Sequence, residues 1–333
     1  MNSPKSLSSR RLISRDKRVV TVVVGITAIA ILATLVVSTA LPNTSRFMHV
    51  LHKTGHPLIF GIIALLALSL LGQFDTLVKR PSVIRYVVAF AIAVLVGAMT
   101  EVGQLFTHRG ASAVDVQSDA VGAIAWLAWY AALFQGRELA KRTRWRLSLG
   151  ALALAASTIA VGPLIWCLAA YAVRDAHFPI MLKDPSVLEM YFVAANSGEV
   201  SLATLPGAAD ASERVVKVPI DRGLYPGMQI IEPFPRWSGH RTLAVDVTNP
   251  GEAGLELVVR VQDRQHSGAY DDRFNRNVIV AAKTRTTILV PLHDVEHGPK
   301  QRSLDLDAVA NLNIFAVRAV AGGEFLVSGV WLQ

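Results

Sequence analysis

The sequence predicts a membrane α-helical bundle of about five transmembrane helices, followed by an all-β jelly-roll sandwich domain. Two observations predict this order. Strongly apolar runs recur as far as residue 173, and each meets or approaches the roughly 20 residues needed to cross a bilayer. Beyond residue 185, short stretches of alternating apolar and polar residues are separated by turns rich in Asn, Pro, Gly and Asp. We therefore expect a membrane part and one soluble module.

The membrane part is expected to begin with a basic cytoplasmic segment, residues 1–18. The five spans are predicted at 19–41, 57–73, 83–106, 114–134 and 147–173, so that 19–173 form the bundle, 174–185 a connector and 186–333 the sandwich. The first span has an alternative interpretation as a cleaved signal peptide, because Ser38 and Ala40 form a small-x-small site after a basic leader. We favour a retained anchor, because the apolar run is longer than a usual signal core.

Basic residues gather on one side of these spans. Fourteen of them precede the first span or lie between spans two and three or four and five, whereas Arg46, Lys53 and Arg109 are the only ones on the other side. Because cytoplasmic loops are enriched in Lys and Arg, we expect a multi-pass protein of the bacterial cytoplasmic (inner) membrane, with a cytoplasmic amino terminus and an extracytoplasmic carboxyl-terminal domain. This distribution accounts for the net charge of +8, so no nucleic-acid partner is expected. The only cysteine, Cys167, lies in an apolar run, and no disulfide within the chain is possible.

Polar and ionisable residues stand at the ends of spans two, three and four. A charge near the bilayer centre costs roughly 2.5–3.5 kcal/mol on insertion scales, and less near the interface. With the predicted topology these residues all fall near the outer membrane face, and they are Lys53, His56, Glu101, Gln104, Arg109, Asp115, Asp119 and Gly122. A chain that keeps several such groups in neighbouring helices is expected to use them, and Gly122 would let a neighbouring helix approach closely.

Simpler roles remain open for several of these residues. Ser112-x-x-Asp115 has the pattern of a capping box, in which Asp115 only satisfies amides at a helix start. Lys53 and Arg109 can act as interfacial anchors whose charged ends reach the headgroups. Glu101 can form a purely structural ion pair with Lys53 or Arg109.

In its order, this set of residues resembles the VanZ-like family of small membrane proteins. The resemblance covers about residues 41–134, and its matching stretches are His52-Lys53-Thr54-Gly55-His56, Glu101-Val102-Gly103-Gln104, Arg109, Asp115 and Asp119-Ala120-Val121-Gly122. Asp119 replaces the asparagine that is usual in the family, which adds a potential charge. The family is named for a glycopeptide (teicoplanin) resistance protein. The resemblance therefore implies a role in such resistance, but it implies no known biochemical activity.

The residues themselves point to recognition of a polar headgroup. Spans two and four present their amino-terminal helix ends at the outer face, and such ends favour anions. With Lys53, Arg109 and His56 they suggest a pocket for an anionic headgroup of an envelope lipid or a lipid-linked glycan precursor. The alternatives are an intramembrane enzyme acting on such a headgroup, because a carboxylate beside a histidine can perform acid–base chemistry, and a structural scaffold for envelope proteins. No cofactor is expected, and no nucleophile stands out.

No metal site is assigned in the membrane part. The spacing of His52 and His56 would suit zinc if both lay on one helix. Gly55 and Pro57 weaken that reading, because they suggest that the helix begins only after His56.

Strands of the soluble module are predicted at 187–193, 213–218, 242–247, 255–262, 276–280, 286–290, 311–317 and 325–332. Through residues 243–249, 271–275 and 288–292, the module resembles the galactose-binding-like jelly rolls of carbohydrate-binding modules, which implies binding of an envelope glycan. Sugar sites combine an aromatic platform with planar polar side chains, and the candidates are Trp237, His240, Tyr270, Asp272, Arg273 and Asn275. The simpler interpretation makes Trp237 a core or rim residue and Asp272–Arg273 an ion pair within the domain.

Overall fold

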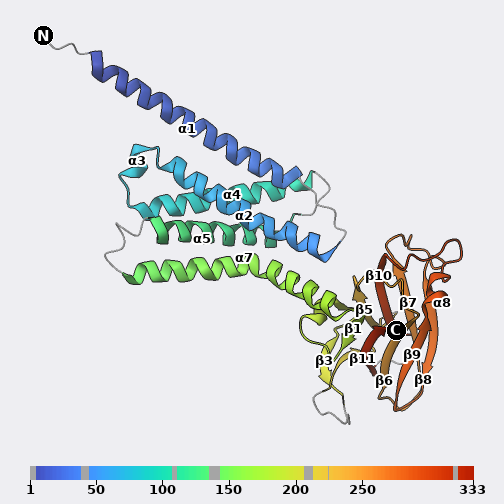
Figure 1. Cartoon of the computed structure of the whole chain (residues 1–333). Helices are drawn as coiled ribbons and strands as arrows, with labels where there is room; N and C mark the ends of the chain where they lie inside the picture. The colour runs from blue at the N-terminus through green and yellow to red at the C-terminus, as the bar shows by residue number, and fades with distance from the viewer. Residues whose placement is uncertain are drawn as a thin grey trace. The chain divides into compact units, whose positions relative to one another are not determined.

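The computed structural model describes residues 5–38, 45–106, 111–134, 143–205, 213–223, 225–317 and 322–333, with side chains from residue 17 onward. The chain divides into two compact units, Met1–Ile165 and Trp166–Gln333. The first unit is helical and the second is built mainly from β-strands (Figure 1).

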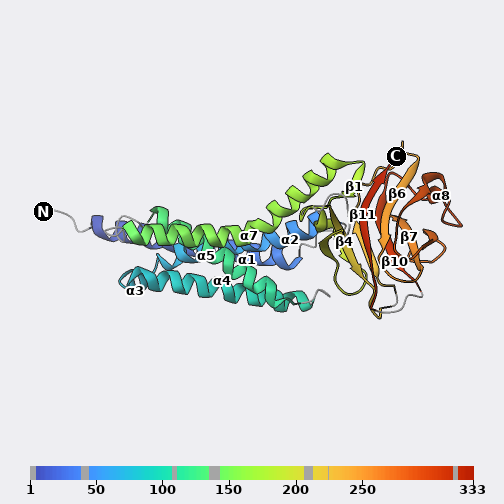
Figure 2. The same cartoon turned by 90° about the horizontal axis from the view of Figure 1, so that it is seen from below.

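The helical unit is organised around three helices that pack against one another, α2, α4 and α5, with α1 packed on α2 and α4 (Figures 1 and 2). The helices are α1 (Lys5–Ser38), α2 (Arg46–Leu71), the short α3 (Asp75–Val78), α4 (Ser82–Leu105), α5 (Ala113–Phe134) and α7 (Thr143–His177). Phe60, Ile63 and Ala123 are fully buried between them. The predicted bundle is therefore confirmed as a fold.

Four of these helices are long and apolar enough to cross a membrane, namely Lys17–Ser38 of α1, α2, α4 and α7. Their surfaces expose many large apolar side chains, among them Leu95, Met99 and Ile159, which suits contact with lipid. The membrane character expected from the sequence is compatible with these helices.

The fifth predicted span, α5, is not among these four. Its 22 residues would cover about 33 Å at 1.5 Å per residue, so its length suffices. Its first two turns, however, carry Asp115, Gln117 and Asp119, which lower its hydropathy. A membrane crossing by α5 stays a prediction.

Helix α2 begins at Arg46, so the expectation that it begins only after His56 is wrong. The Ser45 hydroxyl caps its start by accepting a hydrogen bond of 3.2 Å from the Met48 amide. The helix then continues through Pro57, although proline removes an amide donor. Pro57 is buried together with His56, Phe60 and Gly61 on one face of the helix, and this packing holds the helix through that position.

The β-unit is a sandwich of two antiparallel sheets (Figure 2). The first sheet has the order β3 (Ser201–Thr204), β4 (Arg214–Pro219), β11 (Glu324–Leu332), β6 (Thr242–Asn249) and β9 (Thr284–Pro291), and β1 (Ile180–Lys183) also pairs with β11. The second sheet has the order β2 (Val193–Ala195), β5 (Gly227–Ile231), β10 (Val309–Ala316), β7 (Leu255–Asp263) and β8 (Phe274–Val280). One apolar core fills the space between them.

The strand order is that of a jelly roll. The eight strands from β4 to β11 form the rows β4-β11-β6-β9 and β5-β10-β7-β8, so that the chain crosses repeatedly from one sheet to the other. The predicted all-β jelly roll is confirmed, and seven of the predicted strands correspond to β4 and β6 to β11. The short strands β1, β3 and β5 were not predicted.

The strand predicted at 187–193 is wrong over most of its length. Residues Glu189–Phe192 form a 3₁₀-helix, and only Val193 begins strand β2. Ser186 and Glu189 explain the difference, because the Ser186 amide donates to the Glu189 carboxylate (2.7 Å) and the Glu189 amide donates to the Ser186 hydroxyl (3.3 Å). This reciprocal capping starts a helical turn where alternating residues indicated a strand.

Candidate functional site

The polar residues at one end of the bundle converge from α2, α4 and α5. The Lys53 ammonium lies 3.5 Å from a carboxylate oxygen of Asp115, which joins α2 to α5. One turn further along both helices, His56 Nδ1 lies 3.3 Å from Asp119 Oδ1. The charge of Glu101 on α4 also acts on both His56 and Asp119. Four of the predicted side chains, Lys53, His56, Asp115 and Asp119, thus meet in two contacts across α2 and α5.

The two pairs differ sharply in burial. The Lys53 side chain is 47% exposed, whereas Asp119 is fully buried and His56 is 5% exposed. Within the described residues, neither carboxylate oxygen of Asp119 makes a hydrogen bond of good geometry, and the same holds for Oε1 of Glu101. Oε2 of Glu101 accepts a hydrogen bond of 2.7 Å from the Ser112 amide. Buried acceptors without a well-placed donor are costly, so Oε1 of Glu101 and Oδ2 of Asp119 are available to a ligand that supplies protons.

Close helix contact surrounds the buried pair, because glycines face it. A Cβ added at Gly122 would lie 2.0 Å from the Pro57 carbonyl oxygen, and one at Gly97 would lie 2.8 Å from Asp119 Oδ2. The expectation that Gly122 lets a neighbouring helix approach is confirmed. The neighbour is α2.

Other members of the predicted set are less informative. Gln104 is buried at the same end of α4, while Arg109 lies outside the described residues. Ser112 does cap α5, because its hydroxyl accepts from the Asp115 amide at 3.3 Å. Sequence reasoning missed Thr54 and Thr100, which are polar and buried beside the cluster; the position of Thr100 next to Glu101 was the available signal.

No group of three or more His, Cys, Asp or Glu side chains in the described part of the chain is arranged to hold a metal ion. His52 and His56 do lie on one helix, with ring centroids 5.3 Å apart in an edge contact.

In the sandwich, Trp237 cannot serve as a sugar platform. Its side chain is fully buried in the core, and its indole N–H donates a hydrogen bond of 2.7 Å to the Phe234 carbonyl. The prediction of an exposed aromatic at this position is wrong, and the simpler core role holds. His240 lies beside Trp237, to whose carbonyl its amide donates a hydrogen bond of 3.2 Å, and its ring is 5.3 Å from that of Phe178.

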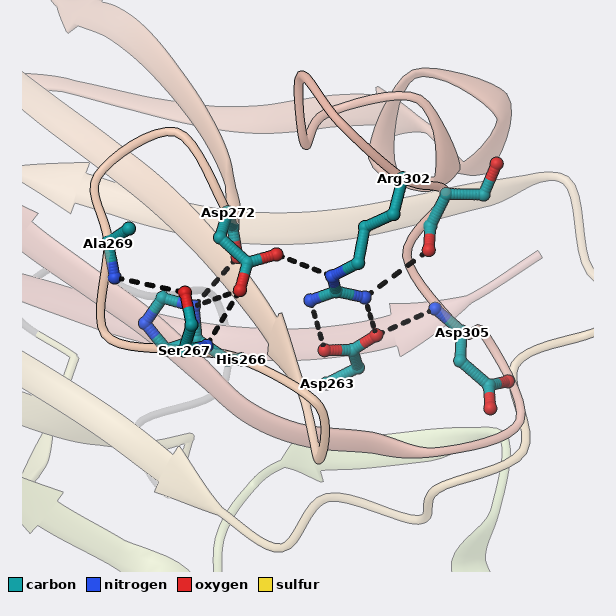
Figure 3. A network of polar contacts seen from close by, with 8 residues as sticks. Asp263, His266, Ser267, Ala269, Asp272, Arg302 and Asp305 are labelled. Carbon is teal, nitrogen blue, oxygen red and sulfur yellow. Dashed lines mark hydrogen bonds and ion pairs between the residues drawn. The ribbon is translucent and has the colours of Figure 1, made fainter.

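Asp272 is held in a network with Arg302 rather than with its sequence neighbour Arg273 (Figure 3). The Arg302 guanidinium donates to Asp272 and also to both carboxylate oxygens of Asp263, with Nη2 2.7 Å from Oδ1. Hydrogen bonds from Ser267, followed by the Arg302 contact, lower the pKa of Asp272 to about 2. We call this network the Arg302 clasp, and it ties residues 263–272 to the segment around residue 302.

The remaining three candidates lie on or beside the outer face of the second sheet. Tyr270 is 68% exposed, and the Arg273 guanidinium lies 5.1 Å from its ring centroid. Asn275 accepts a hydrogen bond of 2.8 Å from Arg260 Nε. The structure thus brings these three side chains together around a residue that was not predicted, Arg260.

A row of polar side chains crosses four strands of this sheet. Gln229 of β5 lies opposite Asn313 of β10, and Asn313 in turn lies opposite Arg260 of β7. Arg260 lies opposite Asn275 of β8. Asn311 extends the row by donating a 2.8 Å hydrogen bond to Gln229. The opposite face of these strands points into the apolar core, because side chains alternate along a strand.

Aromatic rings flank the row at Arg260. The guanidinium lies 4.5 Å from the ring centroid of Phe315, whose ring is 5.4 Å from that of Tyr225. Tyr225 is 53% exposed. Burial and the neighbouring charge of Arg273 lower the pKa of Arg260. We call this surface, made of Tyr225, Gln229, Arg260, Tyr270, Arg273, Asn275, Asn311, Asn313 and Phe315, the ladder face.

Most of the ladder face was missed by sequence reasoning, although a signal was present. Within the strands, Arg260 and Gln262 alternate with apolar core residues, as do Asn311 and Asn313 in part. Polar planar side chains at alternate positions of two strands mark one face of a sheet. Their adjacency depends on strand order, which the sequence does not reveal.

Comparison with known proteins yields fold similarities in the sandwich. No protein-family model and no curated protein matches the chain. An exo-β-agarase aligns with 43% of this chain and 23% of its own, at 16% identity and a TM-score of 0.35. The family 11 carbohydrate-binding module from Clostridium thermocellum, in complex with a β-1,3-1,4-mixed-linked tetrasaccharide, aligns with 42% of this chain and 86% of its own, at 17% identity and a TM-score of 0.30. The CBM22-1 xylan-binding domain from Paenibacillus barcinonensis aligns with 46% and 94%, at 13% identity and a TM-score of 0.33.

The chain spans less than a quarter of the agarase. Because all three TM-scores lie below 0.5, function is argued below from the residues of this chain.

Proposed function

We propose that this chain is a multi-pass membrane protein of the cell envelope whose sandwich binds a glycan on the ladder face. The observation that carries the proposal is the row Gln229, Asn313, Arg260 and Asn275 with aromatic rings beside it. Planar amides and a guanidinium form paired hydrogen bonds with sugar hydroxyls, and exposed tyrosines offer flat apolar surfaces for sugar rings. Both features occur here on one sheet face.

The tyrosines provide the test of glycan binding. We expect Tyr225→Ala and Tyr270→Ala in the detergent-solubilised full chain each to weaken binding about tenfold, or about 1.4 kcal/mol, because each removes an exposed ring from the ladder face. Isothermal titration calorimetry with tetra- to hexasaccharides of β-glucan, xylan, agarose, peptidoglycan and polyuronates measures this.

A matched control for these variants is Leu289→Ala, which removes a 51% exposed apolar side chain from β9 in the other sheet. It should leave affinity unchanged. Absence of binding by the wild-type chain to every oligosaccharide of the panel would overturn the proposal.

We propose in addition that the polar end of the bundle recognises the headgroup of an envelope lipid or a lipid-linked glycan. The supporting observation is that, among the described residues, no donor makes a hydrogen bond of good geometry to the buried Oε1 of Glu101 or Oδ2 of Asp119. Lys53 stands at the more exposed margin of the cluster, where it can meet a phosphate. The carboxylates suit the hydroxyl groups of the same headgroup.

The resemblance to the VanZ-like family, the resistance role that it implies and the bacterial inner-membrane location stay proposals. Their support is the ordered set of polar residues, four of which, Lys53, His56, Asp115 and Asp119, form two contacts across α2 and α5.

A further inference from the structure

Two arginines on the ladder face carry charge that nothing described in the protein neutralises. Arg260 and Arg273 lie close enough for the charge of Arg273 to lower the pKa of Arg260. Within the described ranges, neither guanidinium forms an ion pair. Like charges held together at a partly buried place are unfavourable, so their pairing requires an explanation.

The acidic side chains near the two arginines interact with other residues. Asp272, next to Arg273 in sequence, gives its carboxylate to Arg302 and to the Ser267 amide. Asp263 also binds Arg302, and Asp271 pairs with Lys300 at 2.9 Å. Glu256 on the same face accepts a 2.8 Å hydrogen bond from Asn277, and none of the described ion pairs joins it to either arginine. The Arg302 clasp thus removes the acid nearest in sequence from Arg273.

Both guanidinium groups are oriented for an incoming ligand. Arg260 is fixed by its hydrogen bond to Asn275 and by stacking on Phe315, and its two terminal nitrogens make no hydrogen bond to any described residue. Nε of Arg273 is buried and also makes no hydrogen bond within the described part of the chain. A guanidinium binds a carboxylate in bidentate fashion, through two parallel hydrogen bonds.

We infer that the ladder face selects a glycan that carries anionic groups, with Arg260 and Arg273 binding a sugar carboxylate between Tyr225 and Tyr270. This inference rests on the proposed glycan-binding function and specifies its substrate class. A neutral glycan would leave the two charges uncompensated, whereas a uronic acid would neutralise them in the place where they lie.

The test compares oligosaccharides that differ only in charge, using the full chain in detergent. One pair is tetragalacturonate and its full methyl ester; the other is a glucuronic-acid-substituted xylotetraose and plain xylotetraose. Calorimetry in 50 mM and 300 mM NaCl should give about tenfold tighter binding for the acidic member of at least one pair, and the preference should shrink at the higher salt concentration.

The variants Arg260→Gln and Arg273→Gln should lose this preference for the acid, so that the acidic and the neutral member of the pair bind with about equal affinity. Arg276→Gln is the matched control, because Arg276 lies on β8 next to Asn275 but faces Asp294 at 3.8 Å. It should keep the preference. Unfolding temperatures of all three variants verify that they are folded.

Several outcomes would overturn the inference, and they differ from failure of the proposed function. If acidic and neutral members bind equally and Tyr270→Ala weakens both, glycan binding stands and the anionic class is wrong. Tighter binding of a single-stranded oligothymidine, or of inorganic phosphate alone, would also contradict it. If no oligosaccharide binds at all, both proposals fall.

Discussion

At the scale of single residues, Asp119 shows how burial and function are linked in the membrane part. Its side chain is fully buried, and its partner His56 lies at 3.3 Å without forming a hydrogen bond of good geometry. An arrangement that served stability alone would satisfy these groups, because unpaired buried polar atoms cost about 1–3 kcal/mol each. A bound ligand that donates hydrogen bonds to these oxygens would remove this free-energy cost.

Substitution of the second acid tests this explanation. Glu101→Gln keeps an oxygen that accepts from the Ser112 amide but removes the negative charge. We expect the lipid that copurifies with the wild-type chain to fall by about tenfold or more in the variant, since a hydrogen bond to a charged group is worth roughly 1.5–3 kcal/mol. Mass spectrometry of the retained lipids measures the change.

The control for this prediction is Gln117→Ala, an exposed polar position on α5. It should leave the retained lipid unchanged. An identical lipid profile in wild type and Glu101→Gln would assign the cluster a purely structural role.

At the scale of elements, glycines set how closely α2 and α5 pack. We expect Gly122→Ala to destabilise the bundle by about 1–3 kcal/mol, because its new methyl group would lie 2.0 Å from the Pro57 carbonyl oxygen and force the helices apart. Gly150→Ala is the matched substitution, since nothing lies within 4 Å of its added methyl group on α7. Thermal unfolding in detergent should show a lower midpoint only for Gly122→Ala. Equal shifts would contradict the close contact.

The sequence predicted those features whose signal lies within one short segment of the chain. Apolar length and period-two alternation are local, and they predicted the five long helices, though not where α2 begins, and seven of the strands. The capping pair Ser186 and Glu189 is local as well, but it was outweighed by alternation in the strand prediction. The register that aligns Asn313 with Arg260 comes from strand order, and the partner of Asp272 lies 30 residues away at Arg302. No spacing rule could supply either.

Burial is the second quantity that a single sequence could not settle. Trp237 has the residue type of a sugar platform, yet it lies in the core. Its indole can be buried because one hydrogen bond, donated to the Phe234 carbonyl, satisfies its only polar group. Tyr270 has the same aromatic character and is exposed at the tip of a loop. Only the packed fold separates the two.

At the scale of the whole molecule, the distribution of Lys and Arg makes a prediction about sidedness that cysteine labelling can check. The chain has one cysteine, Cys167, which is fully buried, so the native protein should give a low background. We expect a membrane-impermeant maleimide to label Tyr270→Cys in intact spheroplasts, because the side chain is exposed and the sandwich is expected outside. Lys79→Cys, in the basic loop between α2 and α4, should react only after permeabilisation. The opposite pattern would place the ladder face in the cytosol, where an envelope glycan could not reach it.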